Sequence, residues 1–488
     1  MLITSFAKLV IKNQILINKK LKTKKEGMNM ENMTMMTDLY ELTMAQVYYN
    51  SGKKEEEAIF DVFFRKQPLE LGYAIMGGVD RLIEYIENLG FTEEDIKYLE
   101  NTKLFNKEFI EYLRQFKFTG DIYAIPDGTP IFKGEPLVTV KAPIIEAQII
   151  ETAILSYLNS NICYTTATKK ITEITKDIGI MEFGARRAYG PEAAIEASKC
   201  SIIGGAIGTS NVIAGKKYNI PILGTMAHSM ITEANSEKEA FLNYAKTYPE
   251  NCVLLVDTYD VLKSGVPNAI QVAKEYLIPN GYTLKGIRID SGDLAYLSKE
   301  AKKMLEEAGL ENTKICLSDG LNAKKLQELK RKGAIIDSIG LGDNIVAPDK
   351  GRVGCVYKNV AIIQNGKIIP KIKISSDTAK TINPGFKKVY RIYEKDTNKA
   401  VEDIIALENE KIEKGENYTV EPLQKQIFAN GKKVYKDMSL YEKRDFCTKQ
   451  METIPNEVKS FPKFEEYTVK LSNELSNLKQ KMIAERGQ

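Results

Sequence analysis

The chain has very little of two residue types on which many active sites depend. It contains one histidine and no tryptophan among its 488 residues. HExxH zinc sites, metal centres with several histidine ligands and histidine relays are therefore excluded. Any imidazole chemistry in this protein has to use His228.

Paired cysteines, long apolar runs and an excess of charge are also missing. The six cysteines form no CxxC pair, so zinc ribbons and thioredoxin-like motifs are excluded, and reduced, buried cytoplasmic thiols are expected. No apolar run reaches the roughly 18 residues that a membrane span needs. Lys and Arg number 69 against 65 Asp and Glu, a net charge of only +4. We therefore expect a cytoplasmic protein with no membrane or nucleic-acid partner.

The length and composition of the chain indicate a folded protein of two or three domains. Hydrophobic residues make up 43% and charged residues 27%, which is ordinary for a globular protein. Residues 1–33 are expected to lie outside the fold. The amphipathic stretch 2–21 has no signal-peptide cleavage site. It suits a surface helix, a membrane-touching segment or, as we favour, sequence upstream of a true start at Met28, Met30 or Met33.

Residues 34–145 are predicted to form an α+β domain. A helix is expected at 37–50 behind the N-cap pair Thr37 and Asp38, followed by a strand at 59–65. Further helices are expected at 80–88 and 93–116, and a small antiparallel unit at 120–143. Residues 351–488 alternate apolar and polar positions, which predicts strands returning to this domain, with a charged C-terminal helix at 463–485.

Residues 146–350 follow a different pattern. After a long helical stretch at 146–177, seven short apolar runs each end in a motif rich in Gly, Asp or Ser and then give way to a helical segment. Near-continuous apolar strands joined by helices are typical of parallel strands buried on both faces. Seven such units predict an α/β barrel whose active site lies at the carboxyl ends of the strands.

The polar residues at these strand ends indicate phosphate chemistry. A lone histidine is more often structural, but His228 lies in the small-residue loop GTMAHS, where a bulky anion can approach. Arg288 and Asp290 in RIDSGD would otherwise suit an Asx turn with a salt bridge. Together with Asp257 in DTYD and Arg186 in FGARR, these two residues place carboxylates and arginines at the same end of the predicted barrel. Bound Mg²⁺ would pair with the carboxylates, and a polyphosphate would pair with the arginines.

Two glycine motifs follow the last two predicted strands. SDG ends in Gly320, and GLGD contains Gly340 and Gly342. Loops after the late strands of such barrels often hold phosphate through backbone N–H groups. The expected ligand is therefore an anionic phosphate compound.

At this level of detail the chain resembles the nicotinate phosphoribosyltransferase family. The matching segments run in order from about Thr37 to near the C-terminus: TDLYELTMAQ, FFRK, FGARRAYGPEAA, GTSNVIAGKKYNIPILGTMAHS, DTYD, RIDSGDL, SDGLN and NPGFKKVYR. The resemblance implies an N-terminal α+β domain, an irregular, incomplete α/β barrel, a C-terminal extension and a homodimer. It also implies that nicotinate and phosphoribosyl pyrophosphate are joined to nicotinate mononucleotide and pyrophosphate in NAD salvage, with ATP and Mg²⁺.

The resemblance also assigns roles to individual residues. It makes His228 the phosphorylated histidine that couples ATP to substrate binding, and it implies that Tyr40 of the other subunit and Phe183 enclose the pyridine ring. Nicotinate would contact Arg288 and Thr225, diphosphate would contact Arg186, and the ribose would face Asp290. Three glycines would hold the 5′-phosphate: Gly320, Gly340 and Gly342. Many relatives have Thr where this chain has Asp343, whose charge opposes a phosphate contact.

Alternative functions remain at this point. In the nicotinamide-specific relative an Asp accepts the amide N–H, whereas this chain has Ser210, whose hydroxyl does not repel nicotinate. Quinolinate phosphoribosyltransferase shares the fold but usually has a shorter chain and a more basic pocket. A catalytically silent, metabolite-binding paralogue would not need Arg186, His228, Arg288 and Asp290 together. An unrelated barrel lyase would need a catalytic lysine or a metal-ligand set, and no motif of the sequence identifies either one.

Overall fold

The computed structural model describes residues 32–375 and 380–486, which form two compact units. The barrel unit spans Ala167–Asp349, and the sheet unit combines the described residues up to Thr166 with those from Lys350 onward. Helix α7 (Glu151–Thr175) contributes to both units. Of the expected extension, residues 1–31 lie outside the described residues. Asn32, by contrast, donates a hydrogen bond to the Gly90 carbonyl, so it belongs to the fold of the sheet unit.

The sheet unit is organised around a seven-stranded antiparallel sheet. N-terminal strands form its centre and C-terminal strands lie on both sides, because β1 pairs with both β5 and β12, and β3 pairs with both β5 and β17. In spatial order the strands are β13 (Lys367–Pro370), β12 (Cys355–Gln364), β1 (Glu57–Phe64), β5 (Val138–Pro143), β3 (Asp121–Ala124), β17 (Lys425–Ala429) and β18 (Lys432–Lys433).

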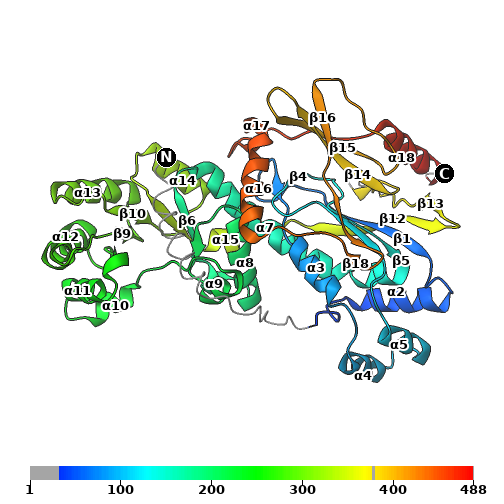
Figure 1. Cartoon of the computed structure of the whole chain (residues 1–488), viewed down its shortest axis with the longest axis horizontal. Coiled ribbons are helices and arrows are strands. Elements are labelled where there is room, and N and C mark those ends of the chain that lie inside the picture. Colours follow the sequence, from blue (N-terminus) through cyan, green and yellow to red (C-terminus); the bar gives the residue numbers. More distant parts are fainter. Residues whose placement is uncertain (1–31, 376–379, 487–488) are drawn as a thin grey trace. The chain divides into compact units, whose positions relative to one another are not determined.

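A second sheet in this unit is built largely from the C-terminal segment. Its order is β16 (Tyr418–Pro422), β14 (Lys387–Glu394), β15 (Lys399–Leu407) and β19 (Val469–Leu471), and a two-stranded sheet pairs β2 (Ala74–Ile75) with β4 (Pro130–Ile131). The helices are α2 (Leu39–Asn50), α3 (Val79–Glu87), α4 (Glu93–Thr102), α5 (Lys107–Arg114), α6 (Ile144–Ile149), α16 (Leu440–Thr453), α17 (Asn456–Lys459) and α18 (Asn473–Arg486). Figure 1 shows α18 beside β14 and β15.

Strand β1 shows why this sheet lies in the core. Its sequence EAIFDVFF is nearly continuous in apolar residues, and both of its faces are buried. Phe60 stacks on Tyr357 of the neighbouring strand, with ring centroids 4.7 Å apart. The buried acidic residue of β1, Asp61, is ion-paired with Lys387 at 2.8 Å. The buried cation of Lys387 offsets the free-energy cost of burying this carboxylate in a central strand.

The barrel unit contains a six-stranded parallel sheet. Its spatial order is β7 (Gly208–Thr209), β6 (Gly179–Glu182), β11 (Ser338–Leu341), β10 (Lys314–Leu317), β9 (Gly286–Ile289) and β8 (Val253–Leu255). The helices of this unit are α8 (Pro191–Ile203), α9 (Val212–Tyr218), α10 (His228–Glu233), α11 (Glu237–Thr247), α12 (Val266–Val272), α13 (Leu294–Glu307), α14 (Ala323–Arg331) and α15 (Asp343–Val346). The predicted parallel α/β architecture is therefore confirmed.

The barrel is open. Six of the seven predicted runs form strands, but the third forms only a parallel bridge between Ile222 and Thr209. This places Ile222 beyond β7 at one edge of the sheet, while β8 is the other edge. Within the described residues no strand pairing joins the two edges. The sheet is a curled, incomplete barrel, in agreement with the prediction.

Three local predictions need correction. The helix expected at 93–116 is interrupted, because Lys103 adopts a left-handed conformation (φ 59°) and separates α4 from α5. The C-terminal helix begins at Asn473, ten residues later than expected from Lys463. Gly340 lies inside β11 and not in the loop after it.

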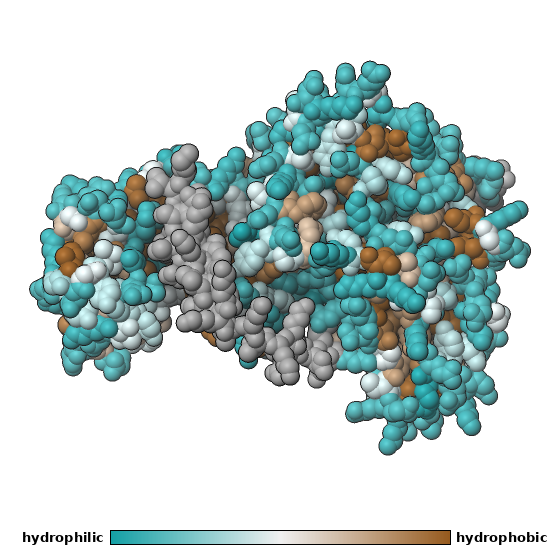
Figure 2. Space-filling view, in the orientation of Figure 1, coloured by the Kyte–Doolittle hydropathy of each residue, from teal (hydrophilic) through white to brown (hydrophobic). Residues whose placement is uncertain are grey.

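The surface and the cysteines agree with the composition. The face in Figure 2 is mostly hydrophilic, with apolar residues in small separate patches. All six cysteines are free, and five of them are buried. Among the described helices, none is both long and apolar enough to span a membrane.

Candidate active site

The polar residues of the barrel unit gather where its parallel strands end. Phe183 follows β6, Asp257 follows β8, Asp290 follows β9 and Ser318 follows β10. Parallel neighbours end at the same edge of a sheet, so these residues share one mouth, where active sites of such barrels lie.

Arg288 is the centre of the first cluster at this mouth. Its Nε donates to Ser318 Oγ at 2.9 Å, and its Nη2 lies 3.1 Å from Asp290 Oδ1. The Ser318 hydroxyl also donates to Asp290. The guanidinium lies over the ring of Phe183, 5.5 Å from its centroid. One face of the site therefore combines a fixed cation with an aromatic surface.

His228 lies in a second cluster with the residues after β8. Its Nδ1 is 3.0 Å from Thr258 Oγ1, and its Nε2 is 3.9 Å from Asp257 Oδ1. Asp257 is buried, and its other oxygen accepts from the Asp290 amide at 3.1 Å and from Ser291 Oγ at 2.6 Å. With the proton on Nε2, Nδ1 can accept from Thr258, whereas the 3.9 Å between Nε2 and Asp257 Oδ1 is too long for a hydrogen bond.

Glu182, the last residue of β6, has a buried carboxylate. It accepts from Ser198 Oγ at 2.9 Å, from Thr209 Oγ1 at 2.5 Å and from the amide of Gly184. Its backbone carbonyl accepts from the Ser210 amide at 2.9 Å. This one residue therefore joins the turn that carries Phe183, helix α8 and the end of β7.

The glycines have different surroundings. A Cβ at Gly340 would lie 2.5 Å from the ring of Phe183, so glycine is required there for the ring to pack. A Cβ at Gly342 would meet the Phe183 carbonyl at 3.4 Å. Gly320 has a φ of +51° and open space around its Cα, as a loop that approaches a ligand with its backbone needs. Asp343 is paired with Arg187 at 3.4 Å.

Some predicted site residues lie outside these clusters. Arg186 and Ser210 are exposed. The hydroxyl of Thr225 is buried and has no hydrogen-bond partner among the described residues. Tyr40 lies on α2 in the sheet unit, with 46% of its surface exposed.

Two glutamates act on the hydroxyl of Tyr40. Burial, reinforced by the charges of Glu151 and Glu41, raises the pKa of the Tyr40 hydroxyl, which hydrogen-bonds to Glu151. Glu41 is buried, accepts from the amide and hydroxyl of Thr152, and is also bonded to Thr37. Burial raises the pKa of Glu41 to about 7, although these hydrogen bonds lower it.

Mg²⁺ is commonly held by one or two carboxylates together with the phosphates of a substrate, without a full protein cage. No cluster of three or more potential metal ligands occurs in the described ranges. Asp257 Oδ1 is buried without a hydrogen-bond partner there. Asp257 and Asp290, joined through the Asp290 amide, therefore fit a shared site for Mg²⁺ and phosphate.

Comparison with known proteins decides the family. Models of the nicotinate phosphoribosyltransferase N-terminal domain, family and C-terminal domain match residues 35–159, 178–402 and 386–479. Nicotinate phosphoribosyltransferase of Bacillus subtilis is 40% identical over 477 residues, which cover 94% of this chain and 97% of the relative. The chain belongs to the nicotinate phosphoribosyltransferase family.

Solved structures agree with this family. The crystal structure of human nicotinic acid phosphoribosyltransferase matches with a TM-score of 0.79 and 26% identity, covering 91% of this chain and 99% of the human one. Nicotinate-nucleotide pyrophosphorylase from Pyrococcus furiosus has the same fold, with a TM-score of 0.70, 22% identity and coverage of 88% and 99%. This chain therefore shares its fold with both solved structures.

Three residues of the site are not predicted from the sequence: Glu182, Thr258 and Ser318. Glu182 could have been noticed as the one acidic residue in the apolar run IGIMEFG. Thr258 and Ser318 lie inside motifs that were recognised, but nothing in the sequence indicates that they contact His228 and Arg288.

Proposed function

We propose that this chain couples nicotinate and phosphoribosyl pyrophosphate to nicotinate mononucleotide and pyrophosphate, in NAD salvage. The observation that carries the proposal is the Arg288 guanidinium over the ring of Phe183. Nicotinate is an aromatic carboxylate, and this pair offers one face for its ring and one cation for its charge. Relatives named nicotinate phosphoribosyltransferase support the same reaction.

Breaking the bond between the anomeric carbon and pyrophosphate requires cations that stabilise the leaving group, and it requires no strong base. The pyridine nitrogen attacks the anomeric carbon as the bond to the pyrophosphate oxygen breaks, and the leaving group carries the developing negative charge. Arg186, on the exposed turn after Phe183, is available to that charge. Bound Mg²⁺, held by Asp257 and Asp290 with phosphate oxygens, would supply further positive charge. Gly320 and Gly342 would hold the 5′-phosphate, while Gly340, inside β11, leaves room for the ring of Phe183.

We assign the ATP-dependent step to His228. Its imidazole takes the terminal phosphoryl group of ATP, ADP leaves, and water later releases phosphate. Attack through Nδ1 leaves the ring proton on Nε2, which faces Asp257 Oδ1 at 3.9 Å. That carboxylate stabilises the positive charge that the ring gains during attack. The phosphoryl group adds about −1.5 to −2 charge, enough to rearrange the neighbouring cations.

The proposal includes a cytoplasmic homodimer in which Tyr40 of one subunit covers the nicotinate of the other. Tyr40, Leu39 and Val47 are exposed on α2, with 46%, 55% and 63% of their surfaces accessible. An aromatic and two aliphatic side chains on one helix suit contact with a second copy. Thr225 and Ser210 complete the proposed nicotinate contacts.

The decisive test is product formation. The protein is incubated with phosphoribosyl pyrophosphate, Mg²⁺ and either nicotinate or nicotinamide, with and without ATP, and mononucleotide and pyrophosphate are measured. We expect far better use of nicotinate, because Ser210 and Arg288 suit a carboxylate. Equal use of both substrates would favour nicotinamide phosphoribosyltransferase, and no product would favour a silent metabolite-binding paralogue.

The phosphohistidine is tested with His228→Ala. This variant should lose ATP hydrolysis and acid-labile labelling but keep slow phosphoribosyl transfer, because the cations at the leaving group remain. ATP should lower the KM for phosphoribosyl pyrophosphate in the wild type only. Undiminished ATP turnover in the variant would refute this role, since the chain has no second histidine.

A further inference from the structure

Arg288 uses one edge of its guanidinium for contacts within the protein. Its Nε donates to Ser318 Oγ at 2.9 Å, and its Nη2 donates to Asp290 Oδ1 at 3.1 Å. The Ser318 hydroxyl in turn donates to the same Asp290 oxygen. Among the described residues, no acceptor is hydrogen-bonded to Nη1. The opposite edge of the guanidinium, formed by Nη1 and Nη2, is therefore available to a ligand.

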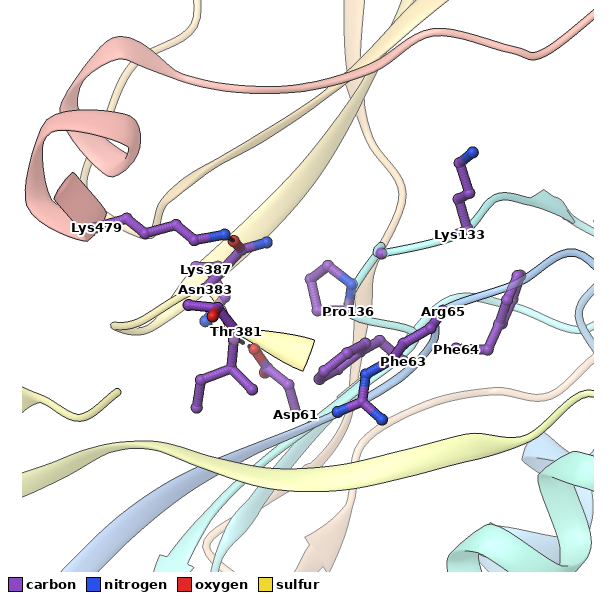
Figure 3. Close-up of a pocket in the computed structure, with 12 residues that line it drawn as sticks. Asp61, Phe63, Phe64, Arg65, Lys133, Pro136, Thr381, Asn383, Lys387 and Lys479 are labelled. Atoms are coloured by element: carbon purple, nitrogen blue, oxygen red, sulfur yellow. Dashed lines mark hydrogen bonds and ion pairs between the residues drawn. The ribbon is translucent and has the colours of Figure 1, made fainter. Parts of the chain in front are cut away.

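Two other buried cations of the protein bond directly to carboxylates. Arg391 uses the same edge as Arg288, and its Nε and Nη2 both donate to Asp403, at 2.9 and 2.7 Å. Lys387 lies 2.8 Å from Asp61 in the wall of a cavity of about 250 Å³ (Figure 3). In both pairs a carboxylate compensates the cation inside the protein. At Arg288 a neutral hydroxyl takes the place of one carboxylate oxygen, so Nε is held without an added negative charge.

Ser318 has little freedom to move. Its amide donates to the Ile289 carbonyl of β9 at 3.0 Å, and only 4% of its surface is exposed. A Cβ at Gly340 would lie 3.4 Å from the Ser318 Cβ and 2.5 Å from the ring of Phe183, so the serine and the ring are close neighbours of this glycine. A hydroxyl that is fixed in this way can fix the plane of the guanidinium from which it accepts.

We propose that Ser318 is a positioning residue that orients the Arg288 guanidinium for the carboxylate of nicotinate. The inference rests on the proposed contact between Arg288 and nicotinate. A carboxylate offers two acceptor oxygens to the edge formed by Nη1 and Nη2, which permits a bidentate pair. An amide offers one acceptor and an NH2 group, whose hydrogens would meet a second donor. Fixing the plane of the guanidinium therefore favours nicotinate over nicotinamide.

Ser318→Ala tests this role in the full chain, because it removes the hydroxyl and nearly keeps the size of the side chain. Rates are measured at saturating phosphoribosyl pyrophosphate, Mg²⁺ and ATP, with nicotinate as substrate and nicotinamide as inhibitor. We expect the KM for nicotinate to rise about tenfold and kcat to change less than about twofold, because the contact is present in both the ground state and the transition state. The inhibition constant of nicotinamide should change less than about twofold, because an amide cannot use the oriented pair of donors.

A double-mutant cycle with Arg288→Lys shows whether Ser318 acts through Arg288. Lysine keeps the positive charge but has no Nε–H from which Ser318 can accept. In this background Ser318→Ala should therefore raise the KM for nicotinate less than about twofold. Additive effects of the two substitutions would overturn the role of Ser318 alone. An unchanged KM for nicotinate in Arg288→Lys would instead overturn the bidentate nicotinate contact of the proposed function, and the inference with it.

Ser298→Ala is the matched control, because Ser298 is a fully buried serine of the same unit. Its hydroxyl donates to the Ala295 carbonyl at 3.3 Å and accepts from the Ile335 amide at 3.1 Å, so the KM for nicotinate should stay unchanged. An unchanged KM in Ser318→Ala, or an equal rise in both variants, would overturn the inference. So would an equal rise of the KM for nicotinate and the inhibition constant of nicotinamide in Ser318→Ala, because the pocket as a whole would then have changed.

Discussion

At the scale of single residues, the barrel mouth has two buried polar atoms without partners among the described residues. They are the Thr225 hydroxyl and one carboxylate oxygen of Asp257. A buried polar atom without a hydrogen bond costs about 1–3 kcal/mol. A ligand that supplies the missing partner recovers this free energy, so both atoms fit substrate or metal contacts better than a purely structural role.

Thr225→Val tests this interpretation, because valine keeps the shape of threonine and removes the hydroxyl. If Thr225 donates to nicotinate, the KM for nicotinate should rise roughly tenfold, the equivalent of about 1.4 kcal/mol. The thermal midpoint should stay the same or rise, because the unpartnered hydroxyl is gone. Thr232→Val is the control on an exposed threonine of the same unit. A lower midpoint with an unchanged KM would show that the hydroxyl is structural.

At the scale of elements, Glu182 has a special position because its carboxylate joins three of them. It connects the turn after β6, helix α8 and the end of β7 without a cation partner among the described residues. The two loops it fixes carry Phe183 and Ser210, the proposed contacts for the ring and the carboxylate of nicotinate. Glu182 therefore acts as a positioning residue.

Glu182→Gln should raise the KM for nicotinate several-fold and reduce the preference for nicotinate over nicotinamide. Glutamine cannot accept from all three donors in the same way, so the loops shift relative to each other. Glu237→Gln is the matched control, because Glu237 is another buried glutamate of this unit and accepts from Ser264 and Asn268. Both variants should lose about 1–3 kcal/mol of unfolding free energy. A similar change of KM in both would mean that only general stability is involved.

Helix α2 contains a group that titrates near neutral pH. Glu41 has a pKa of about 7 in the folded protein, against 4.5 for an unperturbed glutamate. Between these values the unfolded chain releases the proton while the folded chain retains it. The folded state therefore loses stability as the pH rises from about 4.5 through 7.

Glu41→Gln should flatten this pH dependence, because glutamine stays neutral. The unfolding free energy of the wild type should fall by about 1–3 kcal/mol more than that of the variant between pH 4.5 and 8. Urea denaturation at several pH values measures this difference. Glu146, whose pKa is also raised to about 7 by burial, keeps a residual slope in both proteins. Identical slopes would mean that Glu41 is ionised in the folded state at neutral pH.

At the scale of the whole molecule, the sequence predicts the order of elements better than their partners. Six of the seven apolar runs form strands, and the polar residues that end the runs mark the mouth, because burial on both faces leaves a clear pattern. Neither the spatial order of the strands nor the break at Lys103 follows from periodicity. The Lys387–Asp61 pair joins segments far apart in sequence, so only the folded chain brings it together.

A chain that starts at Met30 should keep the thermal midpoint and activity of the full chain. The match to the family begins at residue 35, and the described contacts of the N-terminal segment begin at Asn32. A chain that starts at Met35 removes the hydrogen bonds of Asn32 and Thr34 to Gly90 and should unfold at a lower temperature. A loss already in the Met30 variant would mean that earlier residues pack on the protein.

The opening in the barrel has a mechanical consequence. A closed ring of strands resists a change of circumference, because each strand is bonded to two neighbours. Here the ring is interrupted between Ile222 and β8, and the His228–Thr258 hydrogen bond connects the segments that follow these two edges. In the proposed cycle a phosphoryl group adds its charge at this interruption, beside Asp257. In that proposed step the two edges can move apart without breaking a strand pairing of the described sheet.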